Sequence, residues 1–271
     1  MTQWPARLVL VGAGKMGGAM ALGWLEAGLE PSALTLLEPN PSEEIASLAA
    51  SRGVALNPPK LTPPDVLVLA VKPQSLDATA PGIAPLADAQ TLVLSILAGK
   101  TIANLKARLP RSGAVVRAMP NTPAAIGRGV TAAFASPEVN AEQRRWTERL
   151  FGAVGGFHWL GDEAAIDAVT AISGSGPAYV FALTEALAAA AENLGLPPEL
   201  SMSLARATVE GSGELMRRES GTPPAILRQN VTSPGGTTAA ALAVLLSEGG
   251  LNDLMARAAA AARARAAEMA G

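Results

Sequence analysis

The sequence has no cysteine, only one histidine and few aromatic residues, which make up 3% of its 271 residues. The absence of cysteine excludes a disulfide framework, a thiolate metal site and a thiol nucleophile. The one histidine, His158, lies in the short apolar stretch 157–160, where we expect a structural role. We therefore expect no metal site.

The sequence also has no excess of either charge, since 21 basic residues oppose 23 acidic ones. This balance gives no support for nucleic acid or an anionic membrane as a partner. We find no signal-peptide pattern and no run of about 18 apolar residues free of charge, glycine and proline. We expect a cytoplasmic protein with no nucleic-acid or membrane partner.

A glycine motif stands near the start of the sequence. Gly12, Gly14 and Gly17 follow the apolar run 8–11, which is typical of a buried parallel strand, and they open an apolar helix. The first two glycines allow a tight turn close to a pyrophosphate, and the third lets the helix pack on the strand. The helix start favours phosphate through its free N–H groups. The motif predicts a dinucleotide-binding fold; the alternative is a glycine-rich turn without a ligand.

A second apolar run, 34–37, ends at Glu38, about 20 residues after Gly17. An acidic side chain at this place usually accepts hydrogen bonds from the ribose 2′-hydroxyl of NAD and repels the 2′-phosphate of NADP. The alternative is a solvated glutamate at the end of a strand.

Further apolar runs at 65–71, 91–96, 114–117 and 129–135 alternate with helical patterns. This alternation predicts a Rossmann-type doubly wound parallel sheet over residues 1–160, with ligands at the carboxyl ends of its strands. Lys72 follows one of these runs and is placed to meet a phosphate or a ribose. Asn121 follows another and could bind a nicotinamide carboxamide or serve turn geometry.

The second half of the sequence changes character, because its periodicity is helical from Asp162 onward. We expect residues 161–271 to form an all-α substrate-binding and dimerisation domain. Ser175, shortly before Pro177, is a candidate N-cap of a new helix. Helices with so many small residues, and no sheet to lie on, favour burial against a second copy of the chain, so we predict a homodimer.

Lysine and histidine are missing from this helical half, since all five lysines precede residue 107. An enzyme that reduces a ketone needs a general acid for the oxygen, usually histidine or lysine. A protonated imine is already an electrophile, and a hydroxyl that binds its nitrogen can be enough. Hydroxyl groups occur at two loop–helix junctions, 173–179 and 231–238, and the glycine-rich second junction suits a carboxylate. The alternative is that both junctions are ordinary helix connections.

Six segments resemble the pyrroline-5-carboxylate reductase family, and together they span essentially the whole chain. They are GAGKMG at 12–17, AVKPQ at 70–74, SI at 95–96 with AG at 98–99, Arg117 with MPNTP at 119–123, SGSGPAY at 173–179 and VTSPGGTT at 231–238. The last two are highly specific to the family, whereas many dinucleotide enzymes share the first.

The resemblance implies reduction of 1-pyrroline-5-carboxylate to L-proline, with NADPH or NADH giving hydride to the imine carbon. It implies that Thr238 hydrogen-bonds the ring nitrogen, that the backbone of Gly236, Thr237 and Thr238 holds the carboxylate near Asn230, and that Glu163 faces the substrate. We add the hydroxyls of Ser233 and Ser175 to the substrate-binding candidates. The expected cofactor-binding residues are Gly12, Ala13, Gly14, Lys15, Met16, Gly17, Glu38, Asn57, Ala70, Val71, Lys72, Pro73, Ser95, Ile96, Ala98 and Asn121. The resemblance also implies a dimer built from the helical domains, often assembled into a ring of dimers.

One feature departs from the family pattern. Members that favour NADPH commonly end the second strand with small polar and basic residues, whereas this chain has Glu38-Pro39-Asn40-Pro41. We therefore expect NADH to be used at least as well as NADPH. A reductase of a six-membered cyclic imine acid is an alternative, and pocket size would decide it. A β-hydroxyacid dehydrogenase would need a lysine in the helical half, and a non-enzymatic dinucleotide sensor would not need the hydroxyl-rich junction.

Overall fold

The computed structural model describes residues 4–270, which form two compact units. Unit 1 takes in the described residues up to Ser175 and the end of the chain from Ala262, and unit 2 is Gly176–Ala261. The Rossmann-type unit followed by a helical one confirms the predicted fold class.

Unit 1 is built on one sheet, in which eight strands can be described within residues 4–270. Their spatial order is β3-β2-β1-β4-β5-β6-β7-β8, so the chain starts in the middle and reverses direction after β3. The strands are β1 (Leu8–Val11), β2 (Leu34–Leu37), β3 (Ala55–Leu56), β4 (Val66–Leu69), β5 (Leu92–Ser95), β6 (Val115–Met119), β7 (Gly129–Ala135) and β8 (Gly155–Trp159). In such a sheet the reversal between β1 and β4 opens a crevice at the carboxyl ends of the strands.

Helices cover both faces of the central strands, which are therefore buried throughout. Alternate residues of β1, such as Leu10 and Val11, belong to different core clusters on the two faces. One face packs against α1 (Lys15–Glu26), α2 (Glu43–Arg52) and α5 (Ala141–Gly152), and the other against α3 (Leu76–Ile83) and α4 (Ile102–Arg108). Trp24 of α1 is fully buried and donates its indole N–H to the carbonyl of Leu150 at 2.9 Å, which ties α1 to α5.

One strand pair departs from the fully parallel sheet that the sequence predicts. β7 runs antiparallel to β6, with Ala118 opposite Ala133. A parallel return needs a crossover of a dozen or more residues, and only the short segment with η4 (Thr122–Ile126) joins these strands. The remaining pairs are parallel, including β7 with β8.

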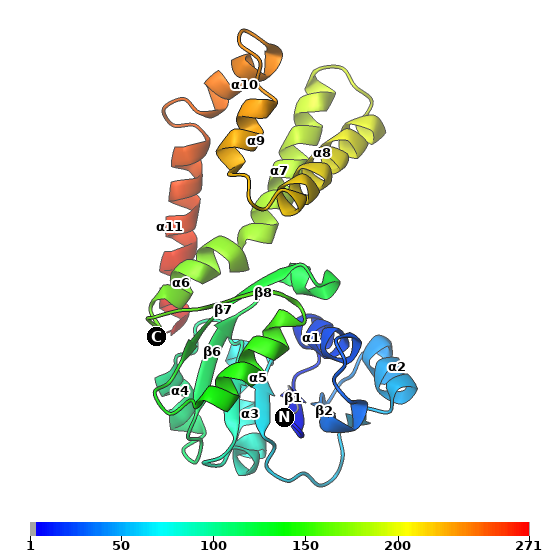
Figure 1. Cartoon of the computed structure of the whole chain (residues 1–271), viewed down its shortest axis with the longest axis vertical. Helices are drawn as coiled ribbons and strands as arrows, with labels where there is room; N and C mark the ends of the chain where they lie inside the picture. Colours follow the sequence, from blue (N-terminus) through cyan, green and yellow to red (C-terminus); the bar gives the residue numbers. More distant parts are fainter. Residues whose placement is uncertain (1–3, 271) are drawn as a thin grey trace. The chain divides into compact units, whose positions relative to one another are not determined.

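Unit 2 consists of helices, with α7 (Gly176–Asn193) packed against α8 (Pro198–Arg218). Figure 1 shows these two helices as a hairpin in light green and yellow. The other helices are α9 (Pro224–Asn230), α10 (Thr237–Leu245) and the first part of α11 (Leu251–Ala270). Many large apolar side chains of unit 2 are exposed, among them Phe181 and Val244.

The helix that leads into unit 2 corrects the interpretation of Ser175. α6 (Ala165–Val169) continues through a π-helical turn, η5 (Thr170–Gly174), into α7. The Ser175 N–H donates to the carbonyl of Thr170 at 2.8 Å, and Ser175 lies between η5 and α7. Its dihedral angles are helical, with φ −87° and ψ −21°, whereas an N-cap residue typically has extended angles. Pro177 has no N–H to donate, and the wider turn before it lets the helix continue.

By length and composition alone, this helix over residues 165–193 could cross a membrane. It is the one such helix among the residues that the structure describes, and Asp167, Glu185 and Pro177 interrupt its apolar sequence.

Candidate active site

The glycine motif forms a turn between β1 and α1 that only glycine can make without a shift. Gly12 has φ +93°, and a Cβ there would lie 2.8 Å from the backbone of Ala70 and Val71 at the end of β4. A Cβ on Gly17 would lie 2.1 Å from the carbonyl oxygen of Gly12. The first turn of α1 therefore sits directly against the loop. Gly14 is different, because a Cβ there meets no atom within 4 Å.

A cavity of about 940 Å³ opens above this turn, at the carboxyl ends of β1, β2 and β4. Its volume falls in the range of small-molecule and cofactor sites. Seven of the expected cofactor residues line it: Gly12, Gly14, Glu38, Asn57, Ala70, Val71 and Lys72. The cavity also has lining residues that are not among the expected cofactor residues, namely Pro39, Asn40, Ser75, Thr79, Gly82 and Ile83, with Val11 and Leu37.

Glu38 is held beside the glycine turn by several hydrogen bonds. One carboxylate oxygen accepts from the Ala13 N–H at 2.9 Å, and the other from the Asn40 N–H at 3.2 Å. The side-chain amide of Asn57 accepts from the Glu38 N–H and donates to the Glu38 carbonyl. A negative charge is thus fixed at the end of β2, where a dinucleotide presents its adenosine ribose.

Two lysines supply positive charge on the same side of unit 1. Lys15 is the first residue of α1, and Lys72 precedes η2 (Pro73–Ser75) at the end of β4. Both are exposed, and within the described part of the chain neither forms an ion pair. Together with the N-terminus of α1 they suit a phosphate group.

The remaining cofactor candidates do not line the cavity. Ala13, Lys15, Met16 and Gly17 belong to the glycine turn, and Pro73, Ser95, Ile96 and Ala98 lie at or just past the carboxyl ends of β4 and β5. Asn121 is buried, and both ends of its amide are used within the fold. It donates to the Ser173 carbonyl at 3.1 Å and accepts from the Val130 N–H at 2.9 Å. This arrangement fits the structural alternative, and the nicotinamide contact stays a prediction.

Glu163 belongs to a charged cluster that sequence reasoning missed. Its carboxylate accepts from the Ile102 N–H at the start of α4, at 2.8 Å, and pairs with the Arg117 guanidinium at 3.4 Å. Arg117 also pairs with Asp167 at 3.3 Å, and its side chain is only 3% exposed. Within residues 4–270 its Nε has no hydrogen-bond partner. Arg117 thus holds the first turns around α6 against β6.

The second hydroxyl-rich junction lies in unit 2 and ends at α10. Gly236 is the N-cap of this helix, and Thr237 and Thr238 are its first two residues. The N–H groups of a helix's first turn have no partner within the helix, so they are available to a carboxylate. Gly235 has φ +70°, and a Cβ on Gly236 would lie 2.5 Å from the Ser233 hydroxyl. The two glycines therefore allow Ser233 to fold back over the helix start, and Asn230 ends the preceding helix α9.

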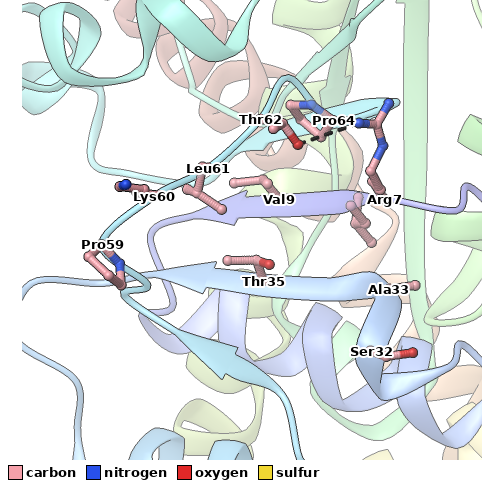
Figure 2. Close-up of a pocket in the computed structure, with 11 residues that line it drawn as sticks. Arg7, Val9, Ser32, Ala33, Thr35, Pro59, Lys60, Leu61, Thr62 and Pro64 are labelled. Carbon is pink, nitrogen blue, oxygen red and sulfur yellow. Dashed lines mark hydrogen bonds between the residues drawn. The ribbon is translucent and has the colours of Figure 1, made fainter.

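A second cavity, of about 630 Å³, lies at the amino ends of β1 and β2. Figure 2 shows its two basic residues, Arg7 and Lys60, at opposite sides, with Val9 and Leu61 between them. Arg7 is also occupied by Asp65 at 3.2 Å and Thr62 at 3.4 Å. The Arg7 and Lys60 side chains do not point to a common position, so this cavity is a poor match for a phosphate or a carboxylate. Among the described residues no group of three metal-ligating side chains is present.

Two glycine substitutions separate the ligand role of the turn from its structural role. Gly14 has φ −68°, so we expect Gly14→Ala to leave the melting temperature within about 2 °C while it weakens dinucleotide binding about tenfold, because the new methyl projects into the cavity. Gly17→Ala should lower both, since its Cβ collides with backbone. Calorimetry and fluorescence titration measure the two effects, and unchanged binding by Gly14→Ala would argue against a cofactor at this turn.

Comparisons with known proteins match both halves of the chain. Residues 163–269 match a family model described as pyrroline-5-carboxylate reductase dimerisation. Residues 7–99 match one described as NADP oxidoreductase, coenzyme F420-dependent.

Relatives are similar over nearly the full length. A pyrroline-5-carboxylate reductase from Pseudomonas aeruginosa is 40% identical over 97% of both chains. The structure of a pyrroline-5-carboxylate reductase from Coxiella burnetii has a TM-score of 0.89 at 34% identity, covering 98% of this chain and 99% of that one. The Plasmodium falciparum pyrroline carboxylate reductase, solved with NADP bound, has a TM-score of 0.80 at 29% identity over 98% of both chains.

Proposed function

The chain belongs to the pyrroline-5-carboxylate reductase family, and from this premise we propose how its residues reduce 1-pyrroline-5-carboxylate to L-proline. The reaction adds one hydride to the carbon of the C=N bond and leaves one proton on the ring nitrogen. The observation that supports this chemistry best is the start of α10, where a threonine hydroxyl and first-turn N–H groups stand together in a half without lysine or histidine. These groups suit an imine next to a carboxylate, and a ketone would require a stronger acid.

We assign the substrate roles to this junction. The Thr238 hydroxyl donates a hydrogen bond to the ring nitrogen and relays a proton when the imine is neutral. The backbone N–H groups of Gly236, Thr237 and Thr238 bind the carboxylate, with Asn230 and the Ser233 hydroxyl beside them. The Gly236 N–H also bonds the Ser233 carbonyl at 3.0 Å, so it would have to be shared.

Two further substrate residues lie in unit 1. Glu163 faces the substrate from the first turn before α6, and the buried Arg117 holds its carboxylate in place. Ser175 lies at the junction between η5 and α7, so its hydroxyl is carried between two helical segments. We propose the boundary between the dinucleotide-binding domain and the helical domain at residues 160 and 161.

The family uses NADH or NADPH, and the residues present fit such a group. A Cβ on Gly14 would project into open space, and the cavity there is lined by both the Glu38 carboxylate and Lys72. When bound, the reduced nicotinamide supplies the hydride. We propose that the glycine turn and Lys15 hold the pyrophosphate, that Glu38 and Asn57 hold the adenosine ribose, and that Ala70, Val71, Lys72 and Pro73 with Ser95, Ile96, Ala98 and Asn121 border the rest.

The helical half is a dimerisation domain, and the protein acts on a small molecule. We propose further that the oligomer is a homodimer that can assemble into a ring of dimers. We also propose that the protein is cytoplasmic and binds neither nucleic acid nor membrane. The exposed apolar side chains of unit 2 support the homodimer, and the balanced charge supports the absence of a nucleic-acid or anionic-membrane partner.

Initial-rate kinetics test the proposed activity. Purified protein should oxidise NADH or NADPH with 1-pyrroline-5-carboxylate and form L-proline, and it should turn over the six-membered cyclic imine acid more slowly. A higher kcat/KM for the six-membered ring would favour the alternative substrate. Turnover of hydroxy acids without turnover of cyclic imines would overturn the proposal.

The same assay tests cofactor preference. Because Glu38 places a carboxylate at the ribose end of the cavity, kcat/KM with NADH should equal or exceed that with NADPH. The carboxylate would repel a 2′-phosphate, and the three residues directly after Glu38 include no arginine to offset this repulsion. A strong preference for NADPH would contradict this reading of Glu38.

A further inference from the structure

Asn57 has an unusual backbone conformation. Its φ is +48°, and it is the one non-glycine residue with positive φ in the described part of the chain. Such a conformation costs free energy for most residues, and asparagine tolerates it better than others. Asn57 directly follows the two-residue strand β3, and its N–H donates to the Leu36 carbonyl at 2.9 Å. The edge of the sheet therefore ends in a turn that aims the Asn57 side chain at β2.

The side chain of Asn57 clamps the backbone of Glu38. Its Oδ1 accepts from the Glu38 N–H at 2.9 Å, and its Nδ2 donates to the Glu38 carbonyl at 2.7 Å. The amide thus takes the place of one pair of backbone hydrogen bonds between β2 and β3, directly after the end of β2. Among side chains of this length, only an amide can donate and accept in this way.

The clamp continues through Glu38 to the glycine turn. The Glu38 carboxylate accepts from Ala13 and Asn40 N–H groups, so one oxygen is bound to the turn itself. Asn57, Glu38 and Gly12 all line the same cavity. With its backbone held by Asn57 and its carboxylate held by the turn, Glu38 cannot swing away from an incoming ribose without breaking these bonds.

We propose that Asn57 is a specificity-determining residue, which selects the 2′-hydroxyl over the 2′-phosphate of the cofactor by holding Glu38 in position. The proposal rests on the proposed function, because it concerns the cofactor of that enzyme. Without the clamp, the Glu38 backbone would lose two hydrogen bonds, and only the Ala13 and Asn40 N–H groups would hold the carboxylate in place. The repulsion of a 2′-phosphate and the hydrogen bonds to a 2′-hydroxyl would then both weaken.

The test is a double-mutant cycle read by cofactor binding without substrate. Asn57→Gly keeps the positive φ accessible and removes the amide. The dissociation constants for NADH and NADPH are measured by fluorescence titration for the natural chain, Asn57→Gly, Glu38→Ala and the double variant. We expect Asn57→Gly to shift the ratio of the two constants about tenfold toward NADPH, and to shift it less than about twofold when Glu38 is already alanine.

Two outcomes would overturn the proposal. If Asn57→Gly weakened the binding of NADH and NADPH equally, Asn57 would only support the ribose or the fold. The same shift of the ratio in the Glu38→Ala background would show that Asn57 does not act through Glu38. Because these titrations contain no imine, failure to reduce 1-pyrroline-5-carboxylate would be seen separately, in the kinetic assay. For variants that are active, the ratio of kcat/KM with NADH to kcat/KM with NADPH is a second measure of the same preference.

Discussion

Thr238→Ala is expected to lower kcat with 1-pyrroline-5-carboxylate about 100-fold, because the hydroxyl that we propose as donor to the reacting nitrogen is lost. Thr238 is the second residue of α10, and its side chain is partly exposed at the start of the helix. The dissociation constants for NADH and NADPH should stay near those of the natural chain, since the cofactor candidates lie in unit 1. Steady-state rates and fluorescence titration measure the two effects.

The matched control is Thr238→Ser, which keeps the hydroxyl and removes only a methyl group. It should retain kcat within several-fold. The pH dependence of kcat also discriminates, because Thr238→Ala should lose most activity where the imine is neutral and needs a proton. An alanine variant with unchanged kcat would remove Thr238 from the mechanism, and a serine variant as slow as the alanine one would assign its role to packing.

The central strands and the glycine turn could be predicted because local sequence specifies them. β1, β4 and β5 are apolar runs buried on both faces, and Gly12 and Gly17 are required by contacts within the turn and with the end of β4. β3 could not be predicted in this way, since Ala55–Leu56 is short and forms only because β2 lies beside it. β7 is antiparallel because the connection from β6 is short, and the pattern of apolar residues within a strand does not indicate its direction.

The site was predictable where it follows a motif and unpredictable where it depends on distant partners. Glu38 and Lys72 were expected at strand ends and line the cavity. Arg117 was noted only as part of a motif, because its partners Glu163 and Asp167 lie 46 and 50 residues away. Asn57 was expected as a cofactor residue, but its contact with the Glu38 backbone, 19 residues away, needed the structure. α5 begins at Ala141 because Asn140 and Gln143 form a capping box at its start.

Leu183→Glu is expected to dissociate the proposed homodimer and to lower the melting temperature by about 10 °C or more. Within the described residues of unit 2, Ala188 and Ala205 are the only buried apolar side chains. Leu183 is 50% exposed and Leu187, one turn further along α7, is 39% exposed. A unit with so little core of its own needs another surface to cover these side chains, and in a twofold dimer the new charge would be buried twice.

Light scattering and calorimetry at several protein concentrations measure the oligomer and its stability. The control is Arg263→Glu in α11, where the side chain is exposed, and this charge reversal should leave the proposed dimer intact. A melting temperature that rises with protein concentration in the natural chain, and no longer in Leu183→Glu, would link stability to association. A Leu183→Glu chain that remains dimeric with unchanged stability would place the interface elsewhere. A natural chain that is folded as a monomer in water would contradict the prediction that unit 2 needs a second surface to cover its apolar side chains.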